Sequence, residues 1–189
     1  MTDDLSTGSP APAPALAVRR LDRYTKDELA QILGDGDDPF GVADTGLTWL
    51  PKEEHFGLAQ NGGRNGGRLV AHAGLRRLPL EVRGVGLEVV GVGGVVVAPG
   101  LRGQGLARQV VGAALEHART MGPQWALLFC RPPLVALYEK LGWRAVDGEV
   151  HVEQPQERLV LMPLRTMWTP LHGDESWPEG AVRLRSLPM

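Results

Sequence analysis

Apolar and polar residues divide the chain into a polar start and a long patterned region. Residues 1–15, MTDDLSTGSPAPAPA, are rich in Pro, Ala and Ser and offer almost nothing to bury, which predicts a disordered tail. A short strand through Val18 follows. KDELAQIL, residues 26–33, places its apolar residues on one helical face, which predicts a helix that ends in the turn GDGDDP, residues 34–39. The stretch 40–54 has no clear pattern.

Strand-like patterns dominate the middle of the chain. HFGLAQ (55–60) and RLVAHAGLRRLPLEV (68–82) are joined by a glycine-rich stretch, NGGRNGGR, and together they predict a hairpin. LEVVGVGGVVVA (87–98) is dense in valine, which is typical of a strand covered on both faces. Its three glycines weaken a regular strand and indicate a bulge or a close backbone approach.

The second half of the chain alternates helices with strands. Residues 104–121 have helical apolar spacing, 125–130 (WALLFC) form a short buried strand, and 134–141 carry an apolar stripe typical of a further helix. Residues 144–153 and 158–164 predict a final strand pair. The order of elements therefore predicts the α/β (α+β) class, with a mixed sheet flanked by helices.

Composition excludes several classes of partner. The 189 residues carry 20 Lys plus Arg against 22 Asp plus Glu, so no global basic field attracts nucleic acid or a membrane surface, and a small-molecule partner is favoured. The single Cys130 cannot form an internal disulfide, which suits a reducing cytoplasm. The sequence also lacks a secretory leader and a stretch of about 20 apolar residues. We therefore expect one cytoplasmic domain.

The most distinctive stretch is VVVAPGLRGQGLA, residues 95–107, which leaves the valine-rich strand at a proline and turns into a helix. A helix after such a turn directs unpaired backbone N–H groups, and the positive end of its dipole, at the preceding loop. Gly103 and Gly105 allow a close backbone approach, and Arg102 and Arg108 add positive charge. Two interpretations are open at this level, a tight strand-to-helix connection and a phosphate cradle.

Common nucleotide and hydrolase motifs do not fit this loop. No G-x-x-x-x-G-K-[ST] is present, the turn lacks the last glycine of a dinucleotide fingerprint, and no G-x-S-x-G elbow occurs. The five histidines lack metal-ligand spacing, so the sequence predicts no metal site.

Two motifs together carry a family resemblance. The order strand, V-x-x-P-x-x-R-G-Q-G-L-A, helix, short strand and then L-Y-E-K-L-G-W resembles the GNAT superfamily of acetyl-CoA-dependent N-acyltransferases. The resemblance is strong over 68–143 and weaker over 16–165. It implies a single-domain GNAT fold, whose mostly antiparallel central sheet contains a splayed strand pair, with residues 166–189 as a C-terminal extension.

The resemblance also implies which residues bind acetyl-CoA. The family's R-x-x-G-x-G/A signature holds the pyrophosphate of the coenzyme on backbone amides, and the strand before it pairs with the pantetheine arm. A bulge at the upstream glycines would free an N–H beside the thioester, where it stabilises the oxyanion. The residues so assigned to acetyl-CoA are Val95, Val96, Val97, Arg102, Gly103, Gln104, Gly105, Leu106 and Ala107.

Tyr138 is the candidate general acid. The thiolate of the coenzyme must be protonated as it leaves. A phenol has a reference pKa of about 10 and a thiol one of about 8.5, so a tyrosine can donate or hydrogen-bond to the developing thiolate. Tyr138 also matches the family's tyrosine in L-Y-E-K-L-G-W. Its place on an apolar helical stripe is equally typical of a core residue.

The general base is less defined. Glu88 lies on the valine-rich strand, but strict alternation places it on the face opposite Val95 and Val97 unless a bulge shifts the register. A chain of water molecules to bulk solvent is another route for the proton. The other candidate side chains are Glu81, His72 and His151.

Further resemblances bear on the acceptor. The motif spacing is similar to that of aminoglycoside 2′-N-acetyltransferases, and DESWPEG (174–180) resembles the end of nodulation-type N-acyltransferases, which modify amino sugars. We therefore expect a small-molecule primary amine, with an amino sugar or aminoglycoside-like compound as one case, although Gly93 replaces an acidic residue of the aminoglycoside enzymes. An extension that folds over the site as a lid would add a cation-attracting rim of Asp174, Glu175 and Glu179.

Two other functions are open at the level of sequence. An acyl-CoA-binding regulatory module would keep the coenzyme cleft without efficient catalysis, and a protein or peptide N-acetyltransferase would need a groove open to a peptide. Tyr138 favours an enzyme over the regulatory module. The edges of the predicted sheet are compatible with a homodimer.

Overall fold

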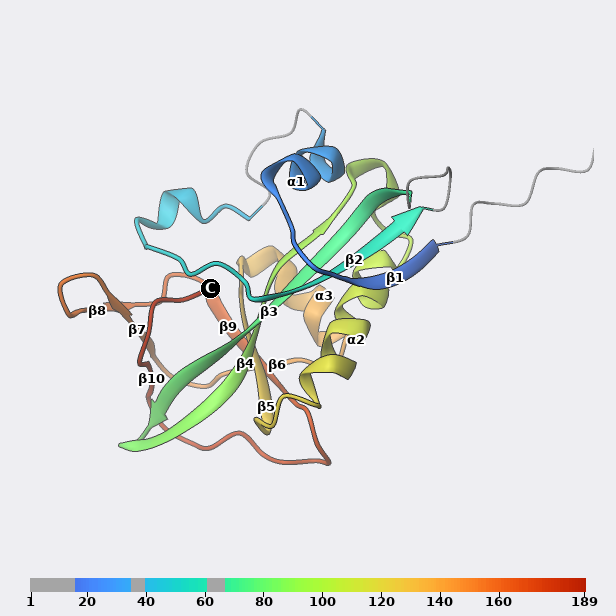
Figure 1. Ribbon diagram of the computed structural model, residues 1–189. Helices are drawn as coiled ribbons and strands as arrows, with labels where there is room; N and C mark the ends of the chain where they lie inside the picture. Colours follow the sequence, from blue (N-terminus) through green and yellow to red (C-terminus); the bar gives the residue numbers. More distant parts are fainter. Residues whose placement is uncertain (1–15, 35–39, 61–66) are drawn as a thin grey trace, which may run out of the picture.

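The computed structural model describes residues 16–34, 40–60 and 67–189, which form one mixed sheet with helices packed on it (Figure 1). The predicted tail at 1–15 lies outside the described residues. Residues 35–39 of the predicted turn and residues 61–66 of the predicted glycine-rich loop also lie outside the described residues.

Ten strands make up the sheet of the described part, in the order β6-β9-β5-β4-β3-β10-β7-β8, with β2 also on β3 and β1 on β2. All pairs are antiparallel except β4–β5 and β10–β7, so the predicted mixed, mostly antiparallel sheet is confirmed. The strands are β1 (Leu16–Leu21), β2 (Glu54–Gln60), β3 (Arg68–Val82), β4 (Val85–Val97), β5 (Trp125–Cys130), β6 (Arg144–Ala145), β7 (Val150–Gln154), β8 (Arg158–Leu161), β9 (Arg165–Pro170) and β10 (Val182–Leu184).

Helix α1 has the predicted bounds, whereas α2 and α3 are shorter than the apolar pattern predicted. A capping box between Thr25 and Glu28 starts α1 at the predicted position. Gly105, in the left-handed conformation with φ +78°, caps α2 and delays its start by two residues. Prolines before α3 form a separate turn of 3-10 helix, because they lack the N–H that a longer helix would need. The helices are α1 (Lys26–Leu33), α2 (Leu106–Ala118) and α3 (Val135–Glu139).

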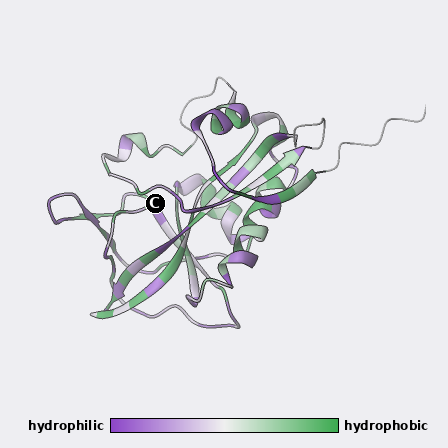
Figure 2. Cartoon of the chain, in the orientation of Figure 1, coloured by the Kyte–Doolittle hydropathy of each residue, from purple (hydrophilic) through white to green (hydrophobic). Residues whose placement is uncertain are grey.

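Apolar residues are buried on both faces of the sheet, as the alternating colours of its strands indicate (Figure 2). One core packs α2 and α3 against the sheet and includes Val110 and Leu128. A second core includes Leu80 and Leu184, at the end of the sheet that β7 and β10 cover. Val96 belongs to a third core, together with residues of α1.

The C-terminal residues belong to the sheet, which corrects the prediction of a separate extension after 165. β9 pairs with β5 along its whole length, and β10 lies between β3 and β7. Trp177 packs against Trp168 and Trp125, with ring centroids 5.7 and 5.9 Å away, so tryptophan packing anchors this segment. The sequence pattern missed both strands because β10 is three residues long and β9 follows β8 after a short turn.

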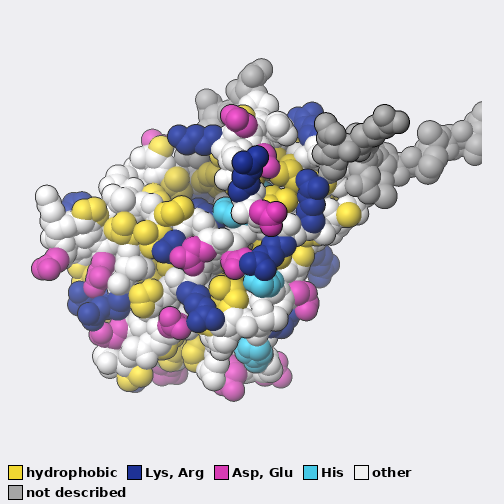
Figure 3. All heavy atoms as spheres, viewed as in Figure 1, with side chains coloured by type: hydrophobic (Ala, Val, Ile, Leu, Met, Phe, Trp, Pro, Cys, Tyr) yellow, Lys and Arg dark blue, Asp and Glu magenta, His cyan; other side chains and the backbone are white. Residues whose placement is uncertain are grey.

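Charged side chains of both signs are interspersed on the face drawn in Figure 3. Within the described ranges, no helix combines the length and the apolar character needed to cross a membrane. In the same ranges, no cluster of three or more His, Cys, Asp and Glu side chains is placed to hold a metal ion.

Candidate active site

The parallel pair at the centre of the sheet separates where β4 reaches its glycines. β4 and β5 are paired only at Val90↔Ala126 and Gly91↔Leu127. For the rest of their length β4 pairs with β3 alone and β5 with β9 alone. Within the described part of the chain, one edge of each strand therefore has no neighbouring strand, and the splayed strand pair that the resemblance implied is present.

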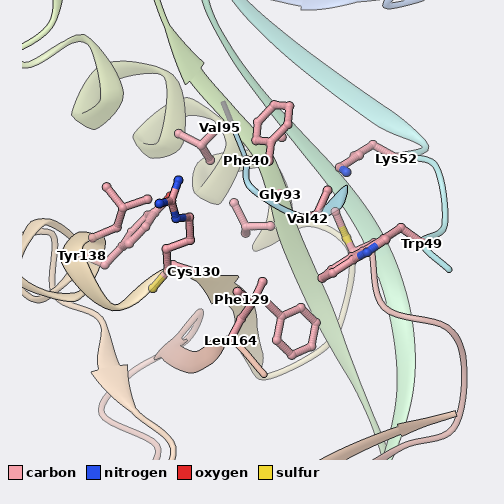
Figure 4. A pocket seen from close by; sticks show the side chains of 15 residues that line it. Phe40, Val42, Trp49, Lys52, Gly93, Val95, Phe129, Cys130, Tyr138 and Leu164 are labelled. Atoms are coloured by element: carbon pink, nitrogen blue, oxygen red, sulfur yellow. The ribbon is translucent and has the colours of Figure 1, made fainter. Parts of the chain in front are cut away.

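A cavity of about 120 Å³ lies in the gap between these strands. Gly93, Gly94 and Val95 of β4 line it, Tyr138 reaches it from α3, and Lys52 reaches it from the segment before β2. In Figure 4, Tyr138 lies on one side of the cavity and Lys52 on the other, with Gly93 and Val95 between them. The unpaired edge of β4 and the candidate acid thus border the same space.

The backbone of β4 presents alternate residues to the gap. Ala98 N–H donates to the carbonyl of Val70 on β3 at 2.8 Å. Successive N–H groups of a strand point in opposite directions. The N–H and C=O groups of Val96 therefore point at β3, as the N–H of Ala98 does, whereas those of Val95 and Val97 point at the gap. Of the three valines assigned to the coenzyme, two therefore offer free backbone groups, and the side chain of Val96 is buried in the core next to α1.

The loop between β4 and α2 has the backbone that an anion cradle requires. Gly103 and Gly105 both have left-handed φ, +80° and +78°, which residues with a side chain rarely adopt. Among the described residues, no side chain caps the first turn of α2, so its N–H groups remain available to a ligand. Arg102 donates through Nε to the carbonyl of Val97 at 3.3 Å, which ties the loop to the end of β4. Arg108 is exposed on the first turn of α2.

Tyr138 is almost fully buried, with 6% of its surface exposed, and its ring packs edge-on against Trp143. Burial raises the pKa of the Tyr138 phenol well above its usual value, and the neighbouring Cys130 raises it further. The phenol therefore stays protonated near neutral pH, as a general acid must. Tyr138 is part of the core and of the cavity wall at once, so the core interpretation is confirmed and its role as general acid stays a prediction.

A β-bulge interrupts the pairing of β4 at its glycines. Gly74 of β3 pairs with Gly93, and His72 pairs with Val96, so one residue of β3 lies opposite two of β4. Gly94 occupies this bulge with a left-handed φ of +60°. Its carbonyl accepts a hydrogen bond from the Nδ1 of His72 at 2.8 Å. The sequence predicted a bulge here, but not its side-chain partner.

Lys52 is a cavity residue that the sequence did not indicate. Its side chain crosses the β3–β4 pair where glycines make room, since a Cβ on Gly74 would lie 2.5 Å from Lys52 Cγ. A Cβ added to Gly93 would lie 3.2 Å from Lys52 Cε. Burial lowers the pKa of Lys52. No sequence signal could have found this residue, because it lies in the stretch 40–54 that has no readable pattern.

The candidate base Glu88 lies elsewhere. Its side chain is 57% exposed, faces Arg77 at 3.9 Å, and lines a separate groove that includes Met121. Of the alternative bases, Glu81 pairs with Arg185 and His151 lies next to Glu149. The observed bulge lies after Glu88 along β4 and does not bring the Glu88 side chain to Tyr138. The geometry therefore does not favour Glu88 as the base.

The predicted acidic rim and the lid are also not at the cavity. Glu179 lines a different groove, together with Arg144 and Trp168. The C-terminal segment instead lines the cavity with Met189, which is 5% exposed and packs against Gly91 and Gly93. Leu50 N–H holds this segment by donating to the carbonyl of Pro188 at 2.6 Å.

Comparison with known proteins gives the same family as the site. The sequence profile of the acetyltransferase (GNAT) domain matches residues 21–146. The chain therefore belongs to the GNAT acetyltransferase family, as the loop and the L-Y-E-K-L-G-W motif predicted, and it is an acetyltransferase. No curated protein sequence matches it.

Solved structures support the fold. The GNAT family N-acetyltransferase YhbS from Escherichia coli, in complex with CoA, is 18% identical over 94% of both chains, with a TM-score of 0.60. The AtaT toxin, bound to the C-terminus of the antitoxin AtaR and acetyl-CoA, is 14% identical over 82% of this chain and 93% of its own, with a TM-score of 0.57. N-acetylglutamate synthase from Neisseria gonorrhoeae, with coenzyme A and N-acetyl-glutamate, is 13% identical over 84% of this chain and 36% of its own, with a TM-score of 0.54.

Proposed function

We propose that the protein transfers the acetyl group of acetyl-CoA directly to a primary amine of a small molecule. The observation that carries the proposal is that the free edge of β4, at Val95, and the protonated phenol of Tyr138 border one cavity. Thioester, amine and acid would meet there without a covalent enzyme intermediate. Structurally similar proteins that contain CoA or acetyl-CoA support the choice of donor.

The donor would lie along β4 and the loop that follows it. Backbone N–H groups from Arg102 to Ala107, including those of Gly103, Gln104, Gly105 and Leu106, would hold the pyrophosphate at the start of α2. The amide groups of the pantetheine arm would pair with the C=O of Val95 and the N–H of Val97, because the carbonyl of Val97 already accepts from Arg102. This arrangement leaves the thioester at the bulge, beside the cavity.

The transfer then needs three events at the thioester. The neutral amine attacks the carbonyl carbon, and a backbone N–H of the bulge stabilises the negative charge that develops on the oxygen. The C–S bond breaks as the tetrahedral intermediate collapses, and Tyr138 donates its proton to the departing thiolate. The amine loses its extra proton to solvent or to a nearby base.

The lining of the cavity favours an acceptor with an apolar body. Trp49, Phe129 and Leu164 contribute apolar surface, and the cations that reach the cavity are Lys52 and Arg131. Among the described residues, no side chain that lines it is acidic. A polycationic aminoglycoside would find no acidic side chain on these walls, whereas nearby cations would lower the pKa of a bound ammonium and favour its nucleophilic form. We therefore prefer an apolar monoamine to the amino sugar suggested by sequence.

A coenzyme-release screen tests the proposal. The purified protein is given acetyl-CoA and panels of apolar monoamines, amino acids, amino sugars, aminoglycosides, polyamines and peptides, and the free thiol is measured. We expect release with apolar monoamines and little with aminoglycosides. Tight acetyl-CoA binding without release on any panel would identify an acyl-CoA-binding module, and release with peptides alone would identify a peptide acetyltransferase.

A further inference from the structure

Two histidines form a hydrogen-bonded chain that ends at the bulge of β4. His72, on β3, is 1% exposed, and its Nδ1 lies 2.8 Å from the carbonyl oxygen of Gly94. Its other ring nitrogen, Nε2, lies 3.0 Å from Nδ1 of His55 on β2. Three adjacent strands are therefore linked through side chains at the place where regular pairing between β3 and β4 is interrupted.

The chemistry of these contacts determines the tautomer of both rings. A carbonyl oxygen can only accept, so Nδ1 of His72 carries the proton. In the neutral ring Nε2 is then the acceptor, and Nδ1 of His55 must donate to it. Burial lowers the pKa of His72 to about 4, so its ring is neutral near pH 7. Neither ring can adopt its other neutral tautomer without losing a buried hydrogen bond.

The bond to Gly94 also sets the direction of the next N–H. The carbonyl of Gly94 and the N–H of Val95 belong to one peptide unit, which is planar, and no cis peptide occurs among the described residues. In a trans peptide these two groups point in opposite directions. Because the carbonyl points at His72, the N–H of Val95 points away from it. Val95 lines the cavity, and its N–H faces the gap between β4 and β5.

The surroundings hold the imidazole of His72 in place. The ring of Tyr24 stacks on it with a centroid distance of 3.6 Å and an interplanar angle of 8°. Lys52 and His55 are the charged or titratable groups that act on His72, and both disfavour a positive charge on its ring. Gly94 has a left-handed φ of +60° and, as a glycine, many accessible conformations, so the hydrogen bond from His72 restrains a peptide that the backbone alone does not fix.

We propose that His72, kept in one tautomer by His55, is a positioning residue that orients the Gly94–Val95 peptide so that the Val95 N–H binds the acetyl carbonyl oxygen. The inference rests on the proposed acetyl transfer. It assigns the oxyanion donor to one N–H and explains why a buried histidine lies behind the bulge. His72 itself does not contact the reacting atoms.

Kinetics of matched variants test this proposal. His72→Phe keeps the aromatic stack and removes the N–H that donates to Gly94. We expect kcat to fall about tenfold or more. Complete loss of an oxyanion donor lowers kcat roughly 10²–10³-fold, and here the Val95 N–H is displaced and not removed. KM for acetyl-CoA should not change. His72→Asn offers an amide N–H close to the position of Nδ1 and should keep most of the activity. His151→Phe, away from the cavity, is the control.

A full kcat in His72→Phe, or an equal loss in His72→Asn, would overturn the proposal. Nuclear magnetic resonance of the wild-type protein tests the same inference without turnover. The His72 ring should show protonated Nδ1 and bare Nε2 at pH 7, and acetyl-CoA should shift the Val95 amide in wild type and His72→Asn but not in His72→Phe. The opposite tautomer would contradict the inference even if no amine is ever acetylated. The absence of thiol release with the expected tautomer would instead count against the proposed function alone.

Discussion

The two sides of the cavity differ in how the chain builds them. The proposed coenzyme side consists of Val95 and Tyr138 in the cavity wall and of the loop from Val95 to Ala107 that continues beyond the cavity, so it comes from one continuous strand-loop-helix segment and a single helical turn. The acceptor side, which includes Trp49, Lys52 and Met189, is assembled from segments far apart in the sequence. Under the proposed function, donor binding would therefore be a local property of the chain, whereas acceptor selection would depend on long-range packing.

The largest effect is expected on the coenzyme side. Tyr138→Phe removes the proton donor but keeps the buried ring, so kcat should fall about 10²-fold or more, in the range known for general acids. The Kd for acetyl-CoA should stay the same. Steady-state kinetics and calorimetry measure the two quantities. An unchanged kcat with a verified amine would remove Tyr138 from the mechanism.

The stability of the protein should respond to pH through His72, which lies behind the bulge of β4. His72 has a pKa of about 4 in the folded protein and, at its usual value, about 6.5 in the unfolded chain. Between these values the unfolded state binds more protons, so stability falls as the pH falls. From pH 7 to pH 5 the wild type should lose about 2 kcal/mol more free energy of unfolding than His72→Asn. Urea titrations at both pH values measure this difference, and equal losses would show that His72 is not a buried neutral base.

The glycines of the coenzyme loop should matter through their backbone. Gly105→Val places a β-branched residue at φ +78°, which costs about 1–2 kcal/mol and should weaken acetyl-CoA binding roughly tenfold. Gly112→Ala, on the body of α2 with open space around it, is the control and should bind normally. Calorimetric titration compares them. Normal affinity in Gly105→Val would argue for a mere strand-to-helix turn.

The smallest effect concerns Lys52. If its charge disfavours the ammonium form of the acceptor, Lys52→Met should raise the apparent pKa of the bound amine. The rise of the rate with pH should then move about 0.5–1 unit to higher pH. The exposed Lys140→Met is the control. A profile that stays in place or moves to lower pH would exclude this role.

The same division explains how much the sequence could predict. The glycine loop, the valine-rich strand and Tyr138 were predicted because each depends on residues adjacent in the chain. His72 could be named only as one base among several, since its partners His55 and Gly94 are joined to it by strand register. Lys52 gave no local signal, because the glycines that accommodate it lie on β3 and β4. β10 was missed because three residues carry no period.

Residue-resolved amide hydrogen exchange with saturating acetyl-CoA tests the central claim most directly, namely that the free edge of β4 receives the coenzyme. Val96 provides an internal reference, because its N–H faces β3 with or without ligand. We expect acetyl-CoA to slow the exchange of the Val95 and Val97 amides and to leave that of Val96 unchanged. Equal exchange of Val95 and Val97 with and without bound acetyl-CoA would contradict it.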